Sequence, residues 1–172
     1  NALLKGTYAD LDGTELTPGG GGGSGSITIG WVTNALTAAT NGRYYRTSNG
    51  LVKLDDGRFF TAGGEVGSQT QSEIINATGD ASVASGSTTA NRTQGVRLVK
   101  LQNDDVLVVG GNASPTTSET WNSGSGLFTA RGACTHVEDG GIVALDNGNA
   151  VVFGGISSGT PLATTQIYDA LA

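Results

Sequence analysis

Short apolar runs alternate with polar, turn-rich segments along most of the chain. The three most apolar runs are each followed by a Gly-Gly pair, and they cover residues 59–62, 106–109 and 150–153. A continuous apolar run of four residues between turn signals is typical of a strand that is buried on both faces. These runs therefore predict the central strands of sheets that pack face to face.

A shorter apolar strand precedes each central run, across a turn of acidic and amide residues. We expect these first strands at 51–54, 98–101 and 142–145. The turns Asp55-Asp-Gly57 and Asp146-Asn-Gly148 are two-residue hairpin signals. Asn103-Asp-Asp105 fills the same turn without glycine, because Asn and Asp tolerate left-handed backbone angles.

A third and a fourth strand follow each Gly-Gly pair after a variable polar loop. The third strands are predicted at 72–76, 118–122 and 165–169, and the fourth at 82–84 and 127–129. The doublets are Gly63-Gly64, Gly110-Gly111 and Gly154-Gly155, whose first glycines lie 47 and 44 residues apart. Four strands in a period of about 45 residues predict a propeller blade. We interpret the glycines as structural, since no Lys-Ser or Lys-Thr follows them as in a phosphate loop.

The repeat resembles the kelch repeat over residues 31–169. The resemblance rests on the Gly-Gly pair, on an aromatic residue in the third strand (Trp121 and Tyr168) and on Phe128 seven residues after Trp121. It departs from the family in the first repeat, which has Ile75 in place of the aromatic residue, and in the last repeat, which lacks a fourth strand. The resemblance implies an all-β protein, a kelch-like β-propeller or partial propeller of about three four-stranded blades. It implies little about function, because such propellers host binding, structural and enzymatic roles.

The order of the strands leaves the predicted propeller open. Residues 27–32, which include Trp31, resemble the fourth strand of a blade whose other strands do not precede it. Three blades are too few for a ring, since propellers have roughly four to eight. Two copies would give six blades, with Trp31 of one copy completing the last blade of the other. The alternative is that the chain is a fragment, or that other chains supply the missing blades.

The N-terminal residues do not fit the repeat. We divide the chain into an N-terminal anchoring segment with a Gly/Ser linker at 1–26, and kelch-like propeller blades at 27–172. The tract Gly19–Gly23 is typical of a flexible tether. Residues 2–8 are expected to form a small anchoring strand.

Composition excludes several classes of function. The net charge of −6 argues against a nucleic-acid partner, which needs a basic face. No apolar run approaches 18 residues, so the sequence predicts no membrane span. Glycine accounts for 29 residues, and with the abundant Ser, Thr and Asn it favours strands joined by tight turns.

Candidate chemistry is sparse, and we expect no enzyme, metal or cofactor. Cys134 and His136 are the only cysteine and the only histidine, which are too few ligands for zinc. A nucleophile pair would need a third orienting group. The copper oxidases that share the kelch fold hold their metal with several His and Tyr residues, and one histidine does not suffice. The turn at Asp55-Asp-Gly57 and the segment Asp10-Leu-Asp-Gly13 lack the ligand set of a calcium loop.

The candidate binding residues are aromatic and arginine side chains. Arg46, Arg92 and Arg131 recur once per repeat, before the next first strand. They would either donate hydrogen bonds to loop carbonyls and join neighbouring blades, or line the end of a channel and meet an anion. Tyr44 and Tyr45 form a candidate sugar-stacking pair beside Arg46, and the remaining candidate is Trp31.

These observations favour a non-enzymatic structural and recognition module on a virion or cell exterior. A phage fibre, spike or capsid-decoration protein fits the Gly/Ser/Thr/Asn composition and the tethered N-terminus. Expected partners are copies of itself or other chains that complete the propeller, with a surface receptor or glycan as candidate ligand. The alternatives are a kelch-like adaptor that binds another protein, and a lectin or carbohydrate-active fragment.

Overall fold

The computed structural model describes residues 50–64, 70–79, 81–135 and 137–170, together with two short N-terminal strands. The chain divides into two compact units, Asn1–Thr33 and Asn34–Ala172. In the first unit, β1 (Tyr8–Ala9) pairs antiparallel with β2 (Glu15–Leu16). The strand expected at 27–32, and residues 2–7 of the one expected at 2–8, lie outside the described residues.

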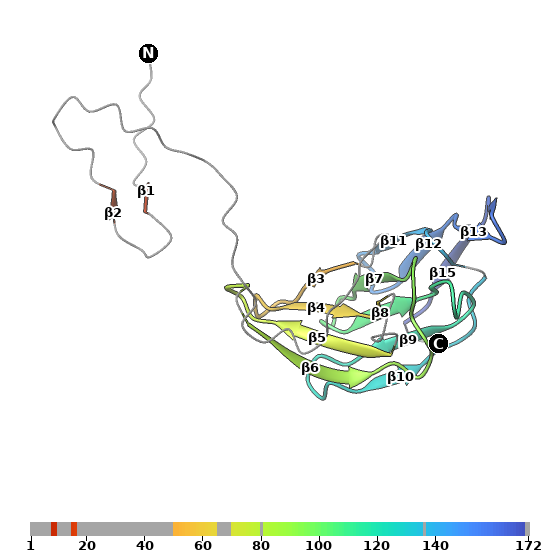
Figure 1. Ribbon diagram of the computed structural model, residues 1–172. Helices are drawn as coiled ribbons and strands as arrows, with labels where there is room; N and C mark the ends of the chain where they lie inside the picture. Colours follow the sequence, from red (N-terminus) through yellow and green to blue (C-terminus); the bar gives the residue numbers. More distant parts are fainter. Residues whose placement is uncertain are drawn as a thin grey trace, which may run out of the picture. The chain divides into compact units, whose positions relative to one another are not determined.

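The second unit contains three larger antiparallel sheets, each following the order of the chain (Figure 1). The first sheet consists of β3 (Val52–Lys53), β4 (Phe59–Ala62), β5 (Gln71–Ile75) and β6 (Ser82–Ser87). The second sheet consists of β7 (Arg97–Lys100), β8 (Val106–Val109), β9 (Ser118–Trp121) and β10 (Phe128–Ala130). The third sheet consists of β11 (Gly141–Ala144), β12 (Ala150–Phe153) and β15 (Thr165–Tyr168).

The central strands confirm the apolar pattern, since β4, β8 and β12 have the bounds predicted for them. All four residues of β8 are buried, as expected for a strand between two packed sheets. One element was missed. The hairpin of β13 (Ile156–Ser157) and β14 (Thr160–Pro161) lies where only a polar loop was expected.

The turns between first and central strands hold three residues, so the two-residue prediction was wrong. In the first sheet the Leu54 amide donates to the Arg58 carbonyl, and the Gly57 amide donates to the Leu54 carbonyl. This pattern is a type I turn followed by one left-handed residue. Gly57 takes that position at φ 87°, and Asp104 takes it in the second sheet at φ 65°. The expectation that Asp replaces glycine there is confirmed, but the turn covers residues 102–104 rather than 103–105.

The first and second sheets pack through aromatic side chains. The ring of Phe60 stacks on Trp121 with centroids 4.2 Å apart, and Phe128 lies 6.2 Å from Phe60. The indole Nε1 of Trp121 donates to the Ser85 hydroxyl at 3.0 Å, which satisfies the one polar atom of a fully buried ring. The first sheet thereby packs on one face of the second.

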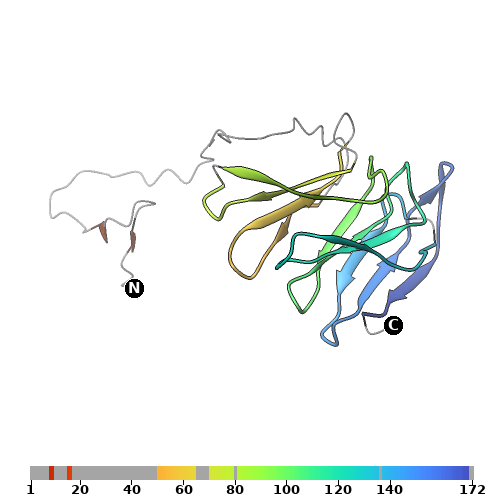
Figure 2. The ribbon, with the colours of Figure 1, turned by 90° about the horizontal axis from the view of Figure 1, so that it is seen from below.

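The second and third sheets pack through smaller aliphatic side chains. Leu107 and Val109 of β8 contact Ala150 and Val152 of β12 in a second core cluster. Alternate residues of β8 thus pack against the first and the third sheet, because successive side chains of a strand point to opposite faces. The three sheets lie side by side in Figure 2, in chain order from yellow to blue.

The first strands of the three sheets lie next to one another. β7 contacts both β3 and β11. The fold is therefore all-β, with two four-stranded antiparallel sheets and one three-stranded antiparallel sheet stacked face to face. The described residues do not form a closed ring of sheets, and none of them forms a helix long and apolar enough to cross a membrane.

Candidate functional site

The Gly-Gly pairs form the junctions between sheets. In the first two pairs, the second glycine donates its amide to the segment that leads into the next sheet, from Gly64 to the Arg92 carbonyl and from Gly111 to the Val137 carbonyl. A Cβ at Gly110 would lie inside contact distance of that Val137 oxygen. The glycines are therefore needed for the close approach of two backbones.

Arg92 is fully buried at the junction of the first and second sheets. Its Nη2 donates to the Glu119 carboxylate at 2.6 Å, and both side chains are at most 1% exposed. Its Nη1 donates to the carbonyls of Gly110 and Thr117. Of the two roles considered for the arginines, Arg92 thus has the structural one, since it donates to carbonyls. Its guanidinium is inaccessible to a soluble anion.

Arg131 does not occupy the position equivalent to Arg92, contrary to the recurrence expected from the sequence. The residue that approaches the next Gly-Gly pair is Val137. Arg131 instead follows β10 directly, and its Nε donates to the Thr120 hydroxyl at 2.9 Å within the second sheet. Because the segment between β10 and β11 runs past the junction in a different register, spacing in the sequence misaligned the two arginines.

The other candidate residues fall outside the part of the chain that the structure describes. These are Trp31, Tyr44, Tyr45 and Arg46, and His136 is outside it as well. The proposed aromatic pair therefore stays a prediction, and the expectation that Cys134 and His136 form no site is likewise untested.

A cavity of about 430 Å³ opens between the second and third sheets. Its floor is Leu107, Val109 and Val152, and its wall is the segment 131–134 after β10. The opposite wall is formed by β15 and Asp169. A neighbouring cavity of about 330 Å³ shares Arg131 and Tyr168 with it. Sequence analysis missed this site, because its walls lie far apart in the chain and meet only after the sheets have stacked.

Cys134 lines this cavity and is half buried. Burial raises the pKa of its thiol, since a low-dielectric surrounding disfavours the thiolate. Burial likewise raises the pKa of the Tyr168 phenol. Neither group is an activated nucleophile or base at neutral pH.

We expect Cys134 to react more slowly with a thiol reagent such as DTNB in the folded protein than in urea. The thiolate is the reactive form, and a raised pKa keeps its fraction low. The rate should therefore rise at a higher pH in the folded chain than in the unfolded one. A folded-state profile at or below that of the unfolded chain would contradict this.

The described part of the chain holds no group of three metal-ligating side chains. Asp55, from one of the turns weighed as a calcium loop, forms an ion pair with Lys100 of the second sheet. That hydrogen bond is the main cause of a raised pKa of the Lys100 ammonium. In this turn, the cation next to the Asp55 carboxylate is the Lys100 ammonium of the neighbouring sheet.

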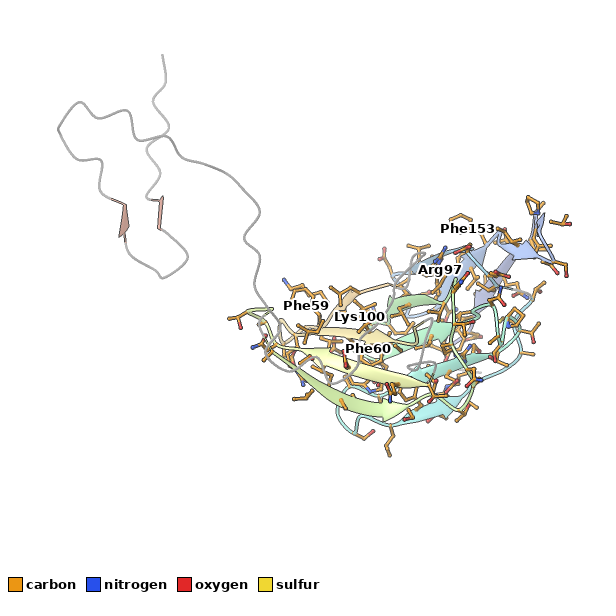
Figure 3. The ribbon with its side chains drawn as sticks, in the orientation of Figure 1. Phe59, Phe60, Arg97, Lys100 and Phe153 are labelled. Carbon is orange, nitrogen blue, oxygen red and sulfur yellow. The ribbon has the colours of Figure 1, made fainter. Side chains whose placement is uncertain are left out.

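The outer face of the third sheet is apolar and exposed. Val143, Phe153 and Ile167 are 50%, 51% and 65% exposed, and half-buried Val151 lies among them in the register of the sheet. Phe153 and Phe60 belong to the third and first sheets, which pack on opposite faces of the second (Figure 3). Apolar side chains gathered on one exposed face are common at the interaction surfaces of folded proteins.

Comparisons with known proteins do not assign the chain to a family. No model of a known protein family matches the sequence, and no curated protein matches it significantly.

Proposed function

We propose that this protein is a non-enzymatic recognition and assembly module made of kelch-like propeller blades. Each meander corresponds to one blade in this interpretation, with β3, β7 and β11 innermost. The proposal places the module on a virion or cell exterior, as a fibre, spike or decoration protein, for which the composition is the support.

One observation carries the assembly part of the proposal, namely the exposed apolar face of the third sheet. The corresponding residues of the second sheet, Leu107 and Val109, are fully buried against the next sheet. In the third sheet the same two positions of the central strand are Val151 and Phe153, and Phe153 is 51% exposed. The exposed face of the third sheet therefore corresponds to the face of the second sheet on which the third sheet packs.

A second copy of the chain is the partner that we propose for this face. Three blades are too few for a ring, whereas two copies supply six. The two junctions within one copy, of the first sheet with the second and of the second with the third, are the precedent for docking a further sheet on this face.

The assembly can be tested by light scattering with Phe153→Asp. We expect the natural chain to form a dimer of twice 17.2 kDa, and the variant to dissociate at least tenfold more readily. A charge on the apolar face would be buried without a partner in the dimer. Leu127→Asp is the matched control, because Leu127 is 65% exposed but lies in the second sheet's turn.

Two results would count against the proposal. The first is a natural chain that stays monomeric at every concentration. The second is equal association of Phe153→Asp and Leu127→Asp, with circular dichroism showing that both variants are folded.

A further inference from the structure

The outer edge of the third sheet differs from that of the other two. β6 pairs with β5 in the first sheet, and β10 pairs with β9 in the second. Within the described ranges, no strand pairs with the outer edge of β15. An unpaired edge presents backbone amides and carbonyls to any extended chain that can reach them.

A hydroxyl group stands at the point where the other two sheets hold their fourth strand. Ser72 of β5 pairs with the last residue of β4, and its Oγ donates to the carbonyls of Ser85 and Gly86. Ser118 begins β9, and its Oγ donates to the Gly132 carbonyl at 2.7 Å. The residue at this position of β15 is Thr165, which is exposed and also carries a hydroxyl group.

The cavity beside β15 occupies the place that an aromatic ring fills in the preceding junction. There, Phe128 of the fourth strand packs on Phe60, the second residue of β4. The second residue of β8 is Leu107, and it lies in the floor of the 430 Å³ cavity. The cavity is therefore the site where the third sheet's own fourth strand would place its aromatic side chain.

We propose that the edge of β15 and this cavity form a strand-binding site for residues 27–32 of a second copy, with Trp31 in the cavity. The proposal rests on the assembly proposed above and specifies how the copies join. Phe128 pairs directly with Trp121, whose counterpart in β15 is Tyr168. Trp31 would thus lie opposite Tyr168, which lines the cavity.

The chemistry of the segment suits this site. Ile27-Thr-Ile-Gly-Trp-Val32 has the alternation of a strand and ends near an aromatic residue. Strand addition to an open edge gains its affinity from main-chain hydrogen bonds, and side-chain pockets give it specificity. A buried indole removes roughly 150–250 Å² of surface from water.

A second copy is favoured over the same chain because of the order of the sheets. Residues 27–32 precede the first sheet in sequence, and the second sheet separates the first sheet from the third.

The test uses Cys134, the only cysteine of the chain, which lines the cavity. Ile29→Cys and Thr33→Cys are introduced separately into the full-length chain, two residues on either side of Trp31. Only cysteines whose Cα atoms lie within about 7 Å can form a disulfide. After mild oxidation we expect a covalent dimer on non-reducing electrophoresis for at least one variant, and none when Cys134→Ser is added.

The outcomes separate this site from the assembly itself. A disulfide within one chain, found as an oxidised monomer by mass spectrometry, would overturn the second-copy assignment. A protein that assembles but forms no cross-link at either position would overturn the strand site and leave the assembly standing. A monomeric natural chain would overturn both. Trp31→Ala should weaken association at least tenfold, whereas Trp31→Phe should retain most of it.

Discussion

Replacing Glu119 by alanine should lower the free energy of unfolding by about 3–5 kcal/mol, the range for removing one partner of a buried ion pair. Glu119 accepts hydrogen bonds from Arg92 Nη2 and from the amides of Thr89 and Ala90. Without the carboxylate, a fully buried guanidinium would keep two carbonyl contacts but lose its counter-charge. Urea unfolding followed by circular dichroism measures the loss.

The double variant Arg92→Leu with Glu119→Leu is the control for this prediction. Replacing both members of a buried pair by apolar residues is often nearly neutral, because no charge is left without a partner. We expect the double variant to recover much of the stability that Glu119→Ala loses. A single variant within about 1 kcal/mol of the natural chain would show that the pair does not hold the first two sheets together.

Gly110→Ala and Gly154→Ala should differ strongly, although both residues are first glycines with a positive φ, 68° and 63°. At either site alanine meets a backbone penalty of about 1–2 kcal/mol. Only at Gly110 does the new Cβ also collide with the Val137 carbonyl, since the nearest atom at Gly154 is 3.7 Å away. Overpacking adds about 1–3 kcal/mol or more at Gly110.

Thermal and urea unfolding of the two variants give this difference directly. Equal destabilisation would mean that the backbone conformation alone selects glycine, and that the approach of the next sheet does not matter. The comparison is also informative for the assembled form. If a further blade docks on the third sheet, Gly154→Ala should weaken association of the copies more than it lowers the stability of one copy.

The sequence predicted the strands well because the decisive signals are local. A run such as Val106–Val109 has no polar position, and such a run is stable only between two packed layers. The turn at Asp104 was predicted for the same reason, since its left-handed conformation depends on the residue type. Local patterns did not give the turn length or the β13–β14 hairpin, which has no apolar alternation.

The candidate site could not be predicted from local patterns, because contacts between sheets create it. Val137 rather than Arg131 meets the Gly110-Gly111 pair, and no repeat spacing reveals which residue of a variable connection does so. The cavity beside β15 likewise depends on a strand that the third sheet does not have in the described residues. The buried partner of Arg92 was also missed, although Glu119 lies in a strand that the sequence predicts.

The junction between sheets has a consequence for how such a chain can change over evolution. Gly64 and Gly111 bind their neighbours through a main-chain carbonyl, which belongs to an arginine in one case and to a valine in the other. This hydrogen bond does not depend on the side chain of the residue that provides the carbonyl. Apart from Arg92, whose buried side chain pairs with Glu119, the connecting segments can therefore accumulate point mutations without separating the sheets. Duplication or loss of a whole unit would preserve the same backbone hydrogen bond between neighbouring sheets.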